Sequence, residues 1–492
     1  MCAMIFEFSI THKITQIFNY FLFVITVVFF SSEVEAQQKQ SLDSLVIGSE
    51  ILVNPASLGD DLPFWFHNQR FGIVDQNSAN GILYAYFNTK LMSTERIDLS
   101  ITAMPVVRNS SHYSMFFNLG DITARYRGFK LSAGRFVDPL AEKENPLSTG
   151  SFIVSRNATP IPKIAFYTDG FIPVPGLQGI VNFKGFYSHG WFEDDRYVKD
   201  VYLHQKYFYL NIKYAFFDAI GGIVHNAQWG GSSPDSEIPN DFNTYVETVF
   251  VLGSSNQNAP RGEQVNAVGN SVAAYDFSLG LDFKPFNFRI YRLFYLEDKV
   301  STRFRSPWDG IWGAVITPKK SALISTILYE HVNTKKQDAF DFEPYGTANY
   351  YNHFIYRSGW AYERRVIGNS LITTNGGEDQ PIINNIIIAH HIGFSGFFSQ
   401  SFDYKFKFTF SRNYGIYRDQ VIERYNPEES TIVGSLIPIS ELKKLNQSFF
   451  FELGYTIPNN PNINIKASTA LDVGELYGNR MGLGLGIKYS ID

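Results

Sequence analysis

The chain of 492 residues has 42 basic and 47 acidic residues, a formal net charge of −5, and this near balance excludes the basic surplus typical of nucleic-acid-binding proteins. Its only cysteine is Cys2, so the remaining chain has no thiol for a nucleophile, a thiolate metal site or a disulfide framework. Aromatic residues make up 16% of the sequence; a water-soluble fold would have to bury most of them, whereas a membrane barrel can turn them toward lipid.

Residues 1–36 are predicted to be a secretory signal peptide that is cleaved from the mature chain. Lys13 supplies the positive charge, residues 14–30 form an apolar run, and Val34-Glu35-Ala36 supplies a small-residue cleavage site. The alternative is a retained membrane anchor, for which the uninterrupted part of the run is short. No later apolar stretch approaches the roughly 20 residues of a helical span, so we expect any further membrane crossing to use strands.

Residues 37–81 form a polar segment that we expect to lie in the periplasm or to plug the barrel. Its centre is the motif LPFWFHNQRFG at residues 62–72. Beyond it, the chain repeatedly alternates between apolar and polar side chains, the pattern of strands with one apolar face. The strands predicted from this alternation are Ile82–Leu91, Ile97–Val107, Phe116–Tyr126, Phe129–Phe136, Gly179–Phe192, Tyr207–Phe217, Ser271–Phe283, Phe286–Leu296, Ala322–Glu330, Phe354–Val366, Ile386–Phe398, Phe402–Arg412, Phe449–Ile457, Ile463–Leu471 and Met481–Tyr489.

The clearest of these strands is Phe402–Arg412. Its even-numbered positions from 402 to 410 are all Phe or Tyr, and its odd-numbered positions from 403 to 411 are all polar. In a soluble sandwich the apolar face would meet a second sheet, and in an outer-membrane barrel it would meet lipid. Removing 36 residues from 492 leaves 456, enough for 16 to 18 strands at about 10 residues per crossing plus connections. We therefore predict an all-β fold, a transmembrane antiparallel β-barrel of about 16–18 strands over residues 82–492, in preference to a soluble β-protein.

The connections between these strands are of two kinds, as in barrels with tight turns at one end and long loops at the other. Residues 283–286 and 399–401 are short enough for hairpins. The long, polar connections are 229–270, 299–321, 332–353 and 413–447.

The segment 148–175 is different because it contains four prolines, at positions 160, 162, 173 and 175. Proline cannot donate a hydrogen bond to a neighbouring strand, so this segment is predicted not to be a regular central strand. Two interpretations remain open. The segment is either a loop that folds into the lumen and narrows or closes the pore, or a surface loop between strands.

Several motifs, in their order along the chain, are similar to those of a known family. They are Gly134-Arg135, SRNATPIPK at 155–163, HGWF at 189–192, HQK at 204–206, PWDGIWG at 307–313, YYNH at 350–353, YRSGW at 356–360 and IGN at 367–369. From about residue 60 to its end, the chain resembles the Wzi-like capsule assembly family, in a divergent branch that also begins with a motif like Pro63-Phe64-Trp65. The resemblance implies an outer-membrane barrel of about eighteen strands that acts as a surface lectin for capsular polysaccharide. The better-known branch has a periplasmic helical bundle, for which residues 37–61 are too short.

The sequence contains no convincing set of catalytic or metal-binding residues. Ser188 and His189 are neighbours, as are His390 and His391, and neighbouring side chains on a strand point to opposite faces. Glu193-Asp194-Asp195 lacks the alternating oxygen ligands of a calcium loop. We therefore predict no catalytic residues, no metal and no cofactor, so that the protein is not an enzyme; an enzyme acting on lipids or glycolipids is disfavoured by the missing triad.

Carbohydrate binding has a simpler requirement, because aromatic rings stack on sugar rings and planar polar groups pair with their hydroxyls. Aromatic, basic and acidic residues at or near the predicted strand ends are therefore candidates. The candidate carbohydrate-binding residues are Trp191, Arg305, Trp308, Asp309, Trp312, Tyr350, Tyr351, Arg357, Trp360 and Arg364. The alternative for each ring is the aromatic girdle, which places such side chains at the same depth for contact with lipid alone.

These observations lead to a hypothesis of function and one alternative. We expect a lectin-like, non-enzymatic barrel in the outer membrane that binds or organises capsular or other surface polysaccharide. Its expected partners are that polysaccharide and outer-membrane lipid, with no nucleic acid, and we expect a monomer. The alternative is a porin or substrate-specific channel, whose open lumen would be lined by charges such as Arg289, Lys405, Lys407, Lys466 and Lys488. The two differ in whether the lumen is blocked.

Overall fold

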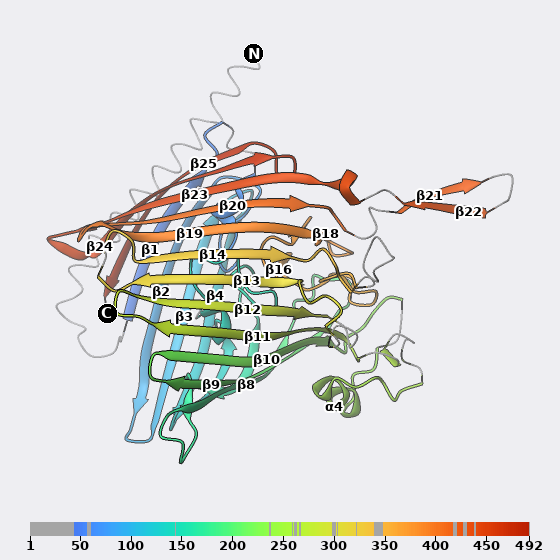
Figure 1. Ribbon diagram of the computed structural model, residues 1–492, viewed down its shortest axis with the longest axis horizontal. Helices are drawn as coiled ribbons and strands as arrows, with labels where there is room; N and C mark the ends of the chain where they lie inside the picture. The colour runs from blue at the N-terminus through green and yellow to red at the C-terminus, as the bar shows by residue number, and fades with distance from the viewer. Residues whose placement is uncertain are drawn as a thin grey trace.

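The computed structural model describes residues 44–491 apart from 57–60, 143, 236–237, 258, 260–262, 265–266, 298–301, 303, 321, 339–347, 417–420, 427–430 and 437–438. The predicted signal peptide lies outside the described residues. The described chain forms a closed antiparallel barrel of 18 strands, with smaller elements at one end (Figure 1). The prediction of an all-β barrel of about 16–18 strands is confirmed.

Each wall strand pairs with the next one along the chain. The wall strands are β1 (Ser44–Val53), β2 (Asn80–Ser93), β3 (Ile97–Asn109), β4 (Tyr113–Tyr126), β5 (Phe129–Arg135), β6 (Pro162–Thr168) with its short continuation β7 (Ile172–Pro173), β8 (Val181–Trp191), β9 (Tyr202–Tyr214), β10 (Phe217–Trp229), β11 (Asn270–Asp282), β12 (Phe286–Leu296), β13 (Gly310–Pro318), β14 (Thr326–Asn333), β19 (Ile387–Ser399), β20 (Phe402–Asn413), β23 (Lys444–Ile457), β24 (Asn460–Gly474) and β25 (Arg480–Ile491). The barrel closes because β1 pairs with both β2 and β25, Leu45 lying opposite Phe87 and Ile491.

The outward face of the wall is apolar, as expected for a surface that meets lipid. On β25, Met481, Leu483 and Leu485 are exposed on the outside. The glycines between them face the lumen, and a Cβ atom on Gly482 would lie 2.5 Å from the ring of Phe66 inside the barrel. Glycine at this position therefore lets a buried loop approach the wall closely.

The two ends of the barrel differ in the length of their connections. Short turns join β4 to β5, β9 to β10, β11 to β12 and β19 to β20, and β25 ends at this same end. At the opposite end the strands are joined by the long segments 54–79, 136–161, 230–269, 334–386 and 414–443. Since outer-membrane barrels have short periplasmic turns and long external loops, we call the long-loop end the outer end and the other the inner end.

Three of the long segments fold back into the barrel, and we call them together the plug. They are 54–79, with α2 (Phe64–His67); 136–161, with α3 (Pro139–Glu142); and 334–386, with β15 (Ala361–Tyr362), β16 (Arg365–Val366), β17 (Thr373–Thr374) and β18 (Ile382–Asn384). All four residues of α2 are buried. Outside the plug, α4 (Phe242–Phe250), the hairpin of β21 (Val421–Asn426) and β22 (Thr431–Leu436), and a short 3-10 turn (Ile439–Leu442) lie at the outer end (Figure 1). Within the described ranges, no helix is long and apolar enough to span a membrane.

The structure corrects several predicted boundaries. Residues 44–53, expected in a periplasmic or plug segment, form wall strand β1, so the barrel begins before residue 82. Residues 162–173 belong to the wall as β6 and β7 rather than to a loop, because Pro162 is the first residue of its strand, a position that requires no donor. Strands β10 and β13 were missed: most of β10 was assigned to no strand, and β13 lies within the predicted long connection 299–321. Residues 354–366 were wrongly predicted as a wall strand; except for the exposed Phe354, their apolar side chains are buried in the plug.

Candidate functional site

The plug is attached to the wall most strongly at Glu330 of β14. Its buried carboxylate accepts hydrogen bonds from the Ser148 hydroxyl at 2.6 Å, and from the backbone N–H and hydroxyl of Thr149 at 2.8 and 2.7 Å. The Tyr291 hydroxyl of β12 donates a fourth, at 2.6 Å. A buried carboxylate is stable only with such partners, so this side chain fixes the position of residues 148–149.

Further hydrogen bonds attach the plug to strands on every side of the barrel. Asp472 of β24 accepts from the N–H of Phe64, Thr409 of β20 from the indole of Trp65, and the carbonyl of Leu147 lies 2.6 Å from Nε2 of His391 in β19. The remaining attachments are Gln228 of β10 to Gly359, Lys163 of β6 to Asp138, and Asn118 of β4 to Phe71. The described plug therefore contacts the wall around its whole circumference.

The three plug segments are also bonded to one another. The Tyr351 hydroxyl donates to the carbonyl of Phe152 at 2.5 Å and accepts from the N–H of Asn369 at 2.9 Å. The Trp360 indole donates to the carbonyl of Ile153 at 2.8 Å. Gln69 extends the connection to the first segment, donating to the carbonyl of Thr149 at 2.9 Å. Residues 148–161 are thus part of the plug. For these residues the structure supports the first interpretation, a loop that folds into the lumen, over a surface loop.

Four predicted carbohydrate-binding residues are internal supports of this assembly. Tyr350, Tyr351 and Trp360 are 0% exposed, and Asp309 is 1% exposed. Asp309 accepts hydrogen bonds from the N–H groups of Lys336 and Gln337, at 3.2 and 2.7 Å, and from the Tyr350 hydroxyl at 3.1 Å. Burial raises the pKa of Asp309 to about 6. These side chains offer no surface to a sugar, so their predicted binding role is incompatible with this structure.

Three predicted tryptophans lie on the outside of the wall. Trp312 alternates with Ile311, which lines the lumen, and stacks on Trp308 with ring centroids 6.1 Å apart. The guanidinium of Arg292 lies 4.7 Å above Trp312. Trp191 ends β8 on the outward face, with its ring edge against His189. This placement fits the aromatic girdle that was the stated alternative. Arg305 lies in the same loop as Trp308.

The two remaining candidates, Arg357 and Arg364, lie on the outer surface in a network of ion pairs. Arg357 contacts Asp379 at 2.5 Å and Asp235 at 3.2 Å, and stacks on Tyr197 at 4.4 Å. Arg364 contacts Asp195 at 2.7 Å and Glu378 at 3.5 Å. Both arginines have a planar face or edge accessible from outside, so they remain candidates for contact with a polymer.

An outer cavity of about 340 Å³ was not predicted from the sequence. It lies where the first and third plug segments meet the connection between β24 and β25, and it is rich in amide and hydroxyl groups. It is lined by Asp61, Phe64, His67, Asn68, Gln76, Asn77, Asn157, Arg365, Val366, Ser370, Ile372, Thr373, Thr374, Asn375, Ile383, Leu476, Tyr477 and Arg480. The PFW motif, which marked this region as distinctive, was the one signal in the sequence that pointed here.

Rings and cations line this outer cavity together. Phe64 and Tyr477 stack with centroids 5.6 Å apart, and Arg480 pairs with Asp61 at 2.8 Å. Arg365 donates to the carbonyls of His67 and Val74, and forms none of the ion pairs found among the described residues. Burial, with the charge of neighbouring Arg108, lowers the pKa of Arg365 to about 10, so it stays charged at neutral pH. Aromatic faces, amides and a cation without a carboxylate partner suit a hydroxyl-rich or acidic sugar.

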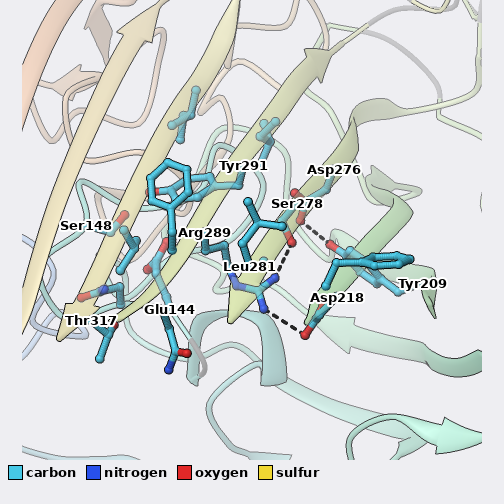
Figure 2. A pocket seen from close by; sticks show the side chains of 18 of the residues that line it. Glu144, Ser148, Tyr209, Asp218, Asp276, Ser278, Leu281, Arg289, Tyr291 and Thr317 are labelled. Carbon is cyan, nitrogen blue, oxygen red and sulfur yellow. Dashed lines mark hydrogen bonds and ion pairs between the residues drawn. The ribbon is translucent and has the colours of Figure 1, made fainter. Parts of the chain in front are cut away.

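A larger inner cavity of about 670 Å³ lies beside strands β9 to β14, toward the inner end (Figure 2). Arg289 donates to Ser278 at 2.9 Å and to Asp218 at 3.1 Å, and Tyr209 donates to Asp276 at 2.8 Å. Its lining reaches the short turns at Ala215 and Asp282, and its opposite side is formed by residues 140–151 of the plug. The inner cavity therefore ends at the plug.

The serine–histidine and histidine pairs point apart, as predicted. Ser188 faces the lumen and donates to Gln205 at 3.3 Å, whereas His189 packs on the outside against Trp191. His391 faces the plug, and His390 meets the Tyr329 hydroxyl on the outside at 2.8 Å. No group of three or more His, Cys, Asp or Glu residues in the part of the chain that the structure describes is arranged to hold a metal ion.

Comparison with known proteins places this geometry in context. The family model described as "Capsule assembly protein Wzi" matches residues 145–375, which include most of two plug segments. Among solved structures, Wzi of Escherichia coli is similar with a TM-score of 0.53 and 13% identity, over 91% of this chain and 84% of that one. It is described as an outer membrane protein involved in group 1 capsule assembly and as a carbohydrate-binding β-barrel.

Two other barrels align over similar lengths but with lower scores. OccAB3 of Acinetobacter baumannii has 9% identity and a TM-score of 0.45, covering 92% of this chain and 100% of that one. OccK2 of Pseudomonas aeruginosa, solved with glucuronate, has 7% identity and a TM-score of 0.47, covering 92% and 98%. No curated protein matches the sequence. The family match over residues 145–375 confirms the resemblance to the Wzi capsule assembly family that the motifs indicated.

Proposed function

We propose that this protein is an outer-membrane barrel that binds or organises surface polysaccharide on the cell exterior and catalyses no reaction on it. The observation that carries the proposal is the plug. A channel requires a continuous lumen, whereas here three loops bonded to each other and to the wall occupy its outer half. A barrel built in this way presents a fixed outer surface, which suits adhesion rather than transport.

The outer cavity supports a sugar ligand. It combines the stacked rings of Phe64 and Tyr477 with amide side chains and the charged Arg365. The match to the Wzi family supports the same class of ligand, because the similar barrel of Escherichia coli is described as carbohydrate-binding. We therefore place the principal polysaccharide contact at the outer cavity, with Arg357 and Arg364 as secondary contacts on the outer surface.

The proposal extends to location and partners. The apolar outward face and the girdle tryptophans fit contact with outer-membrane lipid, and a cleaved signal peptide would deliver the chain across the inner membrane. The wall closes on itself, so no strand edge in the described barrel demands a second copy. We accordingly propose a monomer whose partners are surface polysaccharide and lipid.

The experiment compares a deletion strain with its parent, measuring cell-attached and shed polysaccharide separately. Loss of attached polymer with undiminished synthesis is the expected result, and unchanged attachment would overturn the proposal. Complementation with Asn77→Ala combined with Tyr477→Ala should restore attachment poorly. Tyr113→Ala is the matched control, because Tyr113 is an exposed tyrosine at the outer end that does not line the cavity. Equal surface levels of the variants, measured in isolated outer membranes, separate binding from folding.

A channel is the second candidate, and the inner cavity is the observation that favours it. The cavity is large, it is lined in part by charged side chains such as Arg289 and Asp218, and it reaches the inner end of the barrel. For a channel, purified wild-type protein should conduct ions in planar bilayers without any alteration of the plug. The polysaccharide proposal predicts that the wild-type protein is silent in this measurement.

A further inference from the structure

The loop 230–269 differs from the plug because its helix packs against the outside of the barrel. The Tyr245 hydroxyl of α4 bonds to that of Tyr187 in β8, and the ammonium of Lys206 in β9 donates to the carbonyl of Val249. Tyr187 and Lys206 point outward, because their neighbours Ser188 and Gln205 are bonded to each other in the lumen. Figure 1 accordingly shows α4 beside the outer ends of β8 to β10.

The wall under α4 is polar, unlike the outward positions of the same strands nearer the inner end. The outward positions of β9 change from Phe208 and Leu210, which are exposed, to Lys206 and His204 beneath the helix. His204 is 0% exposed, and neither of its ring nitrogens has a hydrogen-bond partner. His225 of β10 lies beside it, with ring centroids 6.1 Å apart. A patch of this kind needs a cover, because imidazole and ammonium groups are costly against hydrocarbon.

The height of this patch can be estimated along β9. Ten residues separate His204 from Tyr214, which lies at the turn of the inner end. At about 3.3 Å per residue and a tilt of about 40°, they rise about 25 Å, the height of the apolar band of such barrels. His204 and Lys206 therefore lie at the outer boundary of the hydrocarbon, and so does the helix that covers them.

The helix α4 is amphipathic: one face is buried, and apolar side chains are exposed on another. Asp241 caps it by accepting from the N–H of Thr244 at 2.8 Å, and the buried residues Thr244, Glu247 and Thr248 form one face. Phe242 is 79% exposed and Phe250 67% exposed, and Leu252 follows the helix as a third exposed apolar side chain. Val249 is held at Lys206, two positions from the exposed Phe208, so Phe250 extends the apolar surface of the wall.

We propose that α4 is an interfacial helix, whose Phe242, Phe250 and Leu252 insert among the acyl chains of the outer leaflet while its other face shields the polar patch of His204, Lys206 and His225. The occupant of the exposed face is thus lipid, because that face is continuous with the apolar outer wall. The inference depends on the barrel lying in a membrane and is independent of polysaccharide binding.

The test uses site-specific labelling, which is simple because the only cysteine is Cys2, within the predicted signal peptide. Phe250→Cys and Phe242→Cys are each labelled with an environment-sensitive fluorophore in liposomes that contain spin-labelled quencher lipids. Leu210→Cys on the exposed outer wall is the lipid-facing control, and Asn77→Cys in the outer cavity is the water-facing control.

We expect the labels at 242 and 250 to show blue-shifted emission and to lose at least half their intensity to the quencher lipids, as at 210. Emission and quenching like those at 77 would overturn the proposal. Blue-shifted emission without lipid quenching would also overturn it, because it would indicate a protein partner or a second copy on α4. Heat-modifiable gel mobility of each labelled protein establishes that the barrel has folded.

Discussion

The outer and inner halves of the lumen are enclosed by the same strands but differ in what fills them. In the outer half, Glu330, His391 and Asp472 are buried and bonded to plug residues. In the inner half, Arg289 and Asp218 are bonded to each other on the lining of a cavity of about 670 Å³. Polar side chains point inward in both halves. The difference lies in the loops, so closure of the lumen is a property of the loops rather than of the wall.

Removing part of the plug should abolish the difference between the two halves of the lumen. This change is expected to have the largest effect of those proposed. Arg135 and Pro162 lie opposite each other on β5 and β6, so a short Gly-Ser turn can replace residues 137–160 without disturbing the wall. Combined with a shortened 334–386 segment, this deletion should join the two halves and give discrete ion conductance in planar bilayers. A deletion reaching residue 175 would also remove β6 and is unsuitable. A silent but folded variant would contradict the assignment of these segments as the plug.

A single substitution at Glu330 should weaken the attachment of the plug to the wall. Glu330→Ala removes the acceptor of four hydrogen bonds and leaves buried donors on Ser148, Thr149 and Tyr291. Each buried donor left without an acceptor costs about 1–3 kcal/mol. We expect hydrogen exchange at the Thr149 amide to increase by at least 100-fold. Glu363→Gln, at an exposed carboxylate, is the matched control and should change it little. Unchanged exchange in Glu330→Ala would mean that the plug is held elsewhere.

Low pH should stabilise the outer loops that are bonded to Asp309. Its pKa is raised by burial from about 4 to about 6, so the folded state holds a proton that the unfolded state has already released. The stabilising effect of this proton is present at low pH, and it is lost as the pH rises from about 4 to about 6. The full change amounts to about 3 kcal/mol. We expect exchange at the Lys336 and Gln337 amides, corrected for intrinsic rates, to be slower at pH 5 than at pH 7.5.

The variant Asp309→Asn cannot take up this proton and supplies the comparison for the pH experiment. Its exchange at residues 336 and 337 should vary less with pH than that of the wild type, whatever its absolute rate. The same pH dependence in both proteins would assign the effect to other acidic groups, and Asp309 would lose its role as the titrating support of the outer loops.

The smallest effect is expected at the outer surface. Arg357→Gln removes two exposed ion pairs, to Asp235 and Asp379, and exposed pairs contribute at most about 1 kcal/mol each. The melting temperature should therefore change by only a few degrees. If Arg357 is a secondary polysaccharide contact, attached polymer should decrease while the melting temperature stays near that of the wild type. Unchanged attachment would leave Arg357 with a purely structural role.

The wall was largely predictable from sequence because most strands alternate strictly. On β20 and β25 every second side chain is apolar, since one face forms the outer surface of the wall and the other faces the lumen. β13 was missed because its inward face also lacks polar residues near Gly313. A Cβ atom there would lie 1.9 Å from the ring of Tyr291, which covers the strand from inside. Alternation of apolar and polar residues does not predict a wall strand where aromatic side chains fill the lumen beside it.

The candidate site was predicted less well, because the rings in the loops have three different surroundings. Trp312 lies on the outside of the wall, Trp360 is buried in the plug, and Tyr477 borders the outer cavity. Nothing local distinguishes them. Trp360 is fixed by the carbonyl of Ile153, 207 residues away in sequence, and no motif around either residue encodes that contact. The aromatic content was therefore informative about the membrane but not about which rings reach a ligand.

The seam between β1 and β25 has a consequence for the order of folding. Leu45 pairs with Ile491, so the barrel cannot close until the last strand has joined the first. Until that moment β1 and β25 each present a row of unpaired backbone groups, which are templates for pairing with another chain. Long-range pairing of this kind is slow. The nascent chain is thus most vulnerable to aggregation before closure. A chain truncated before Arg480 would lack β25 and could not close the barrel.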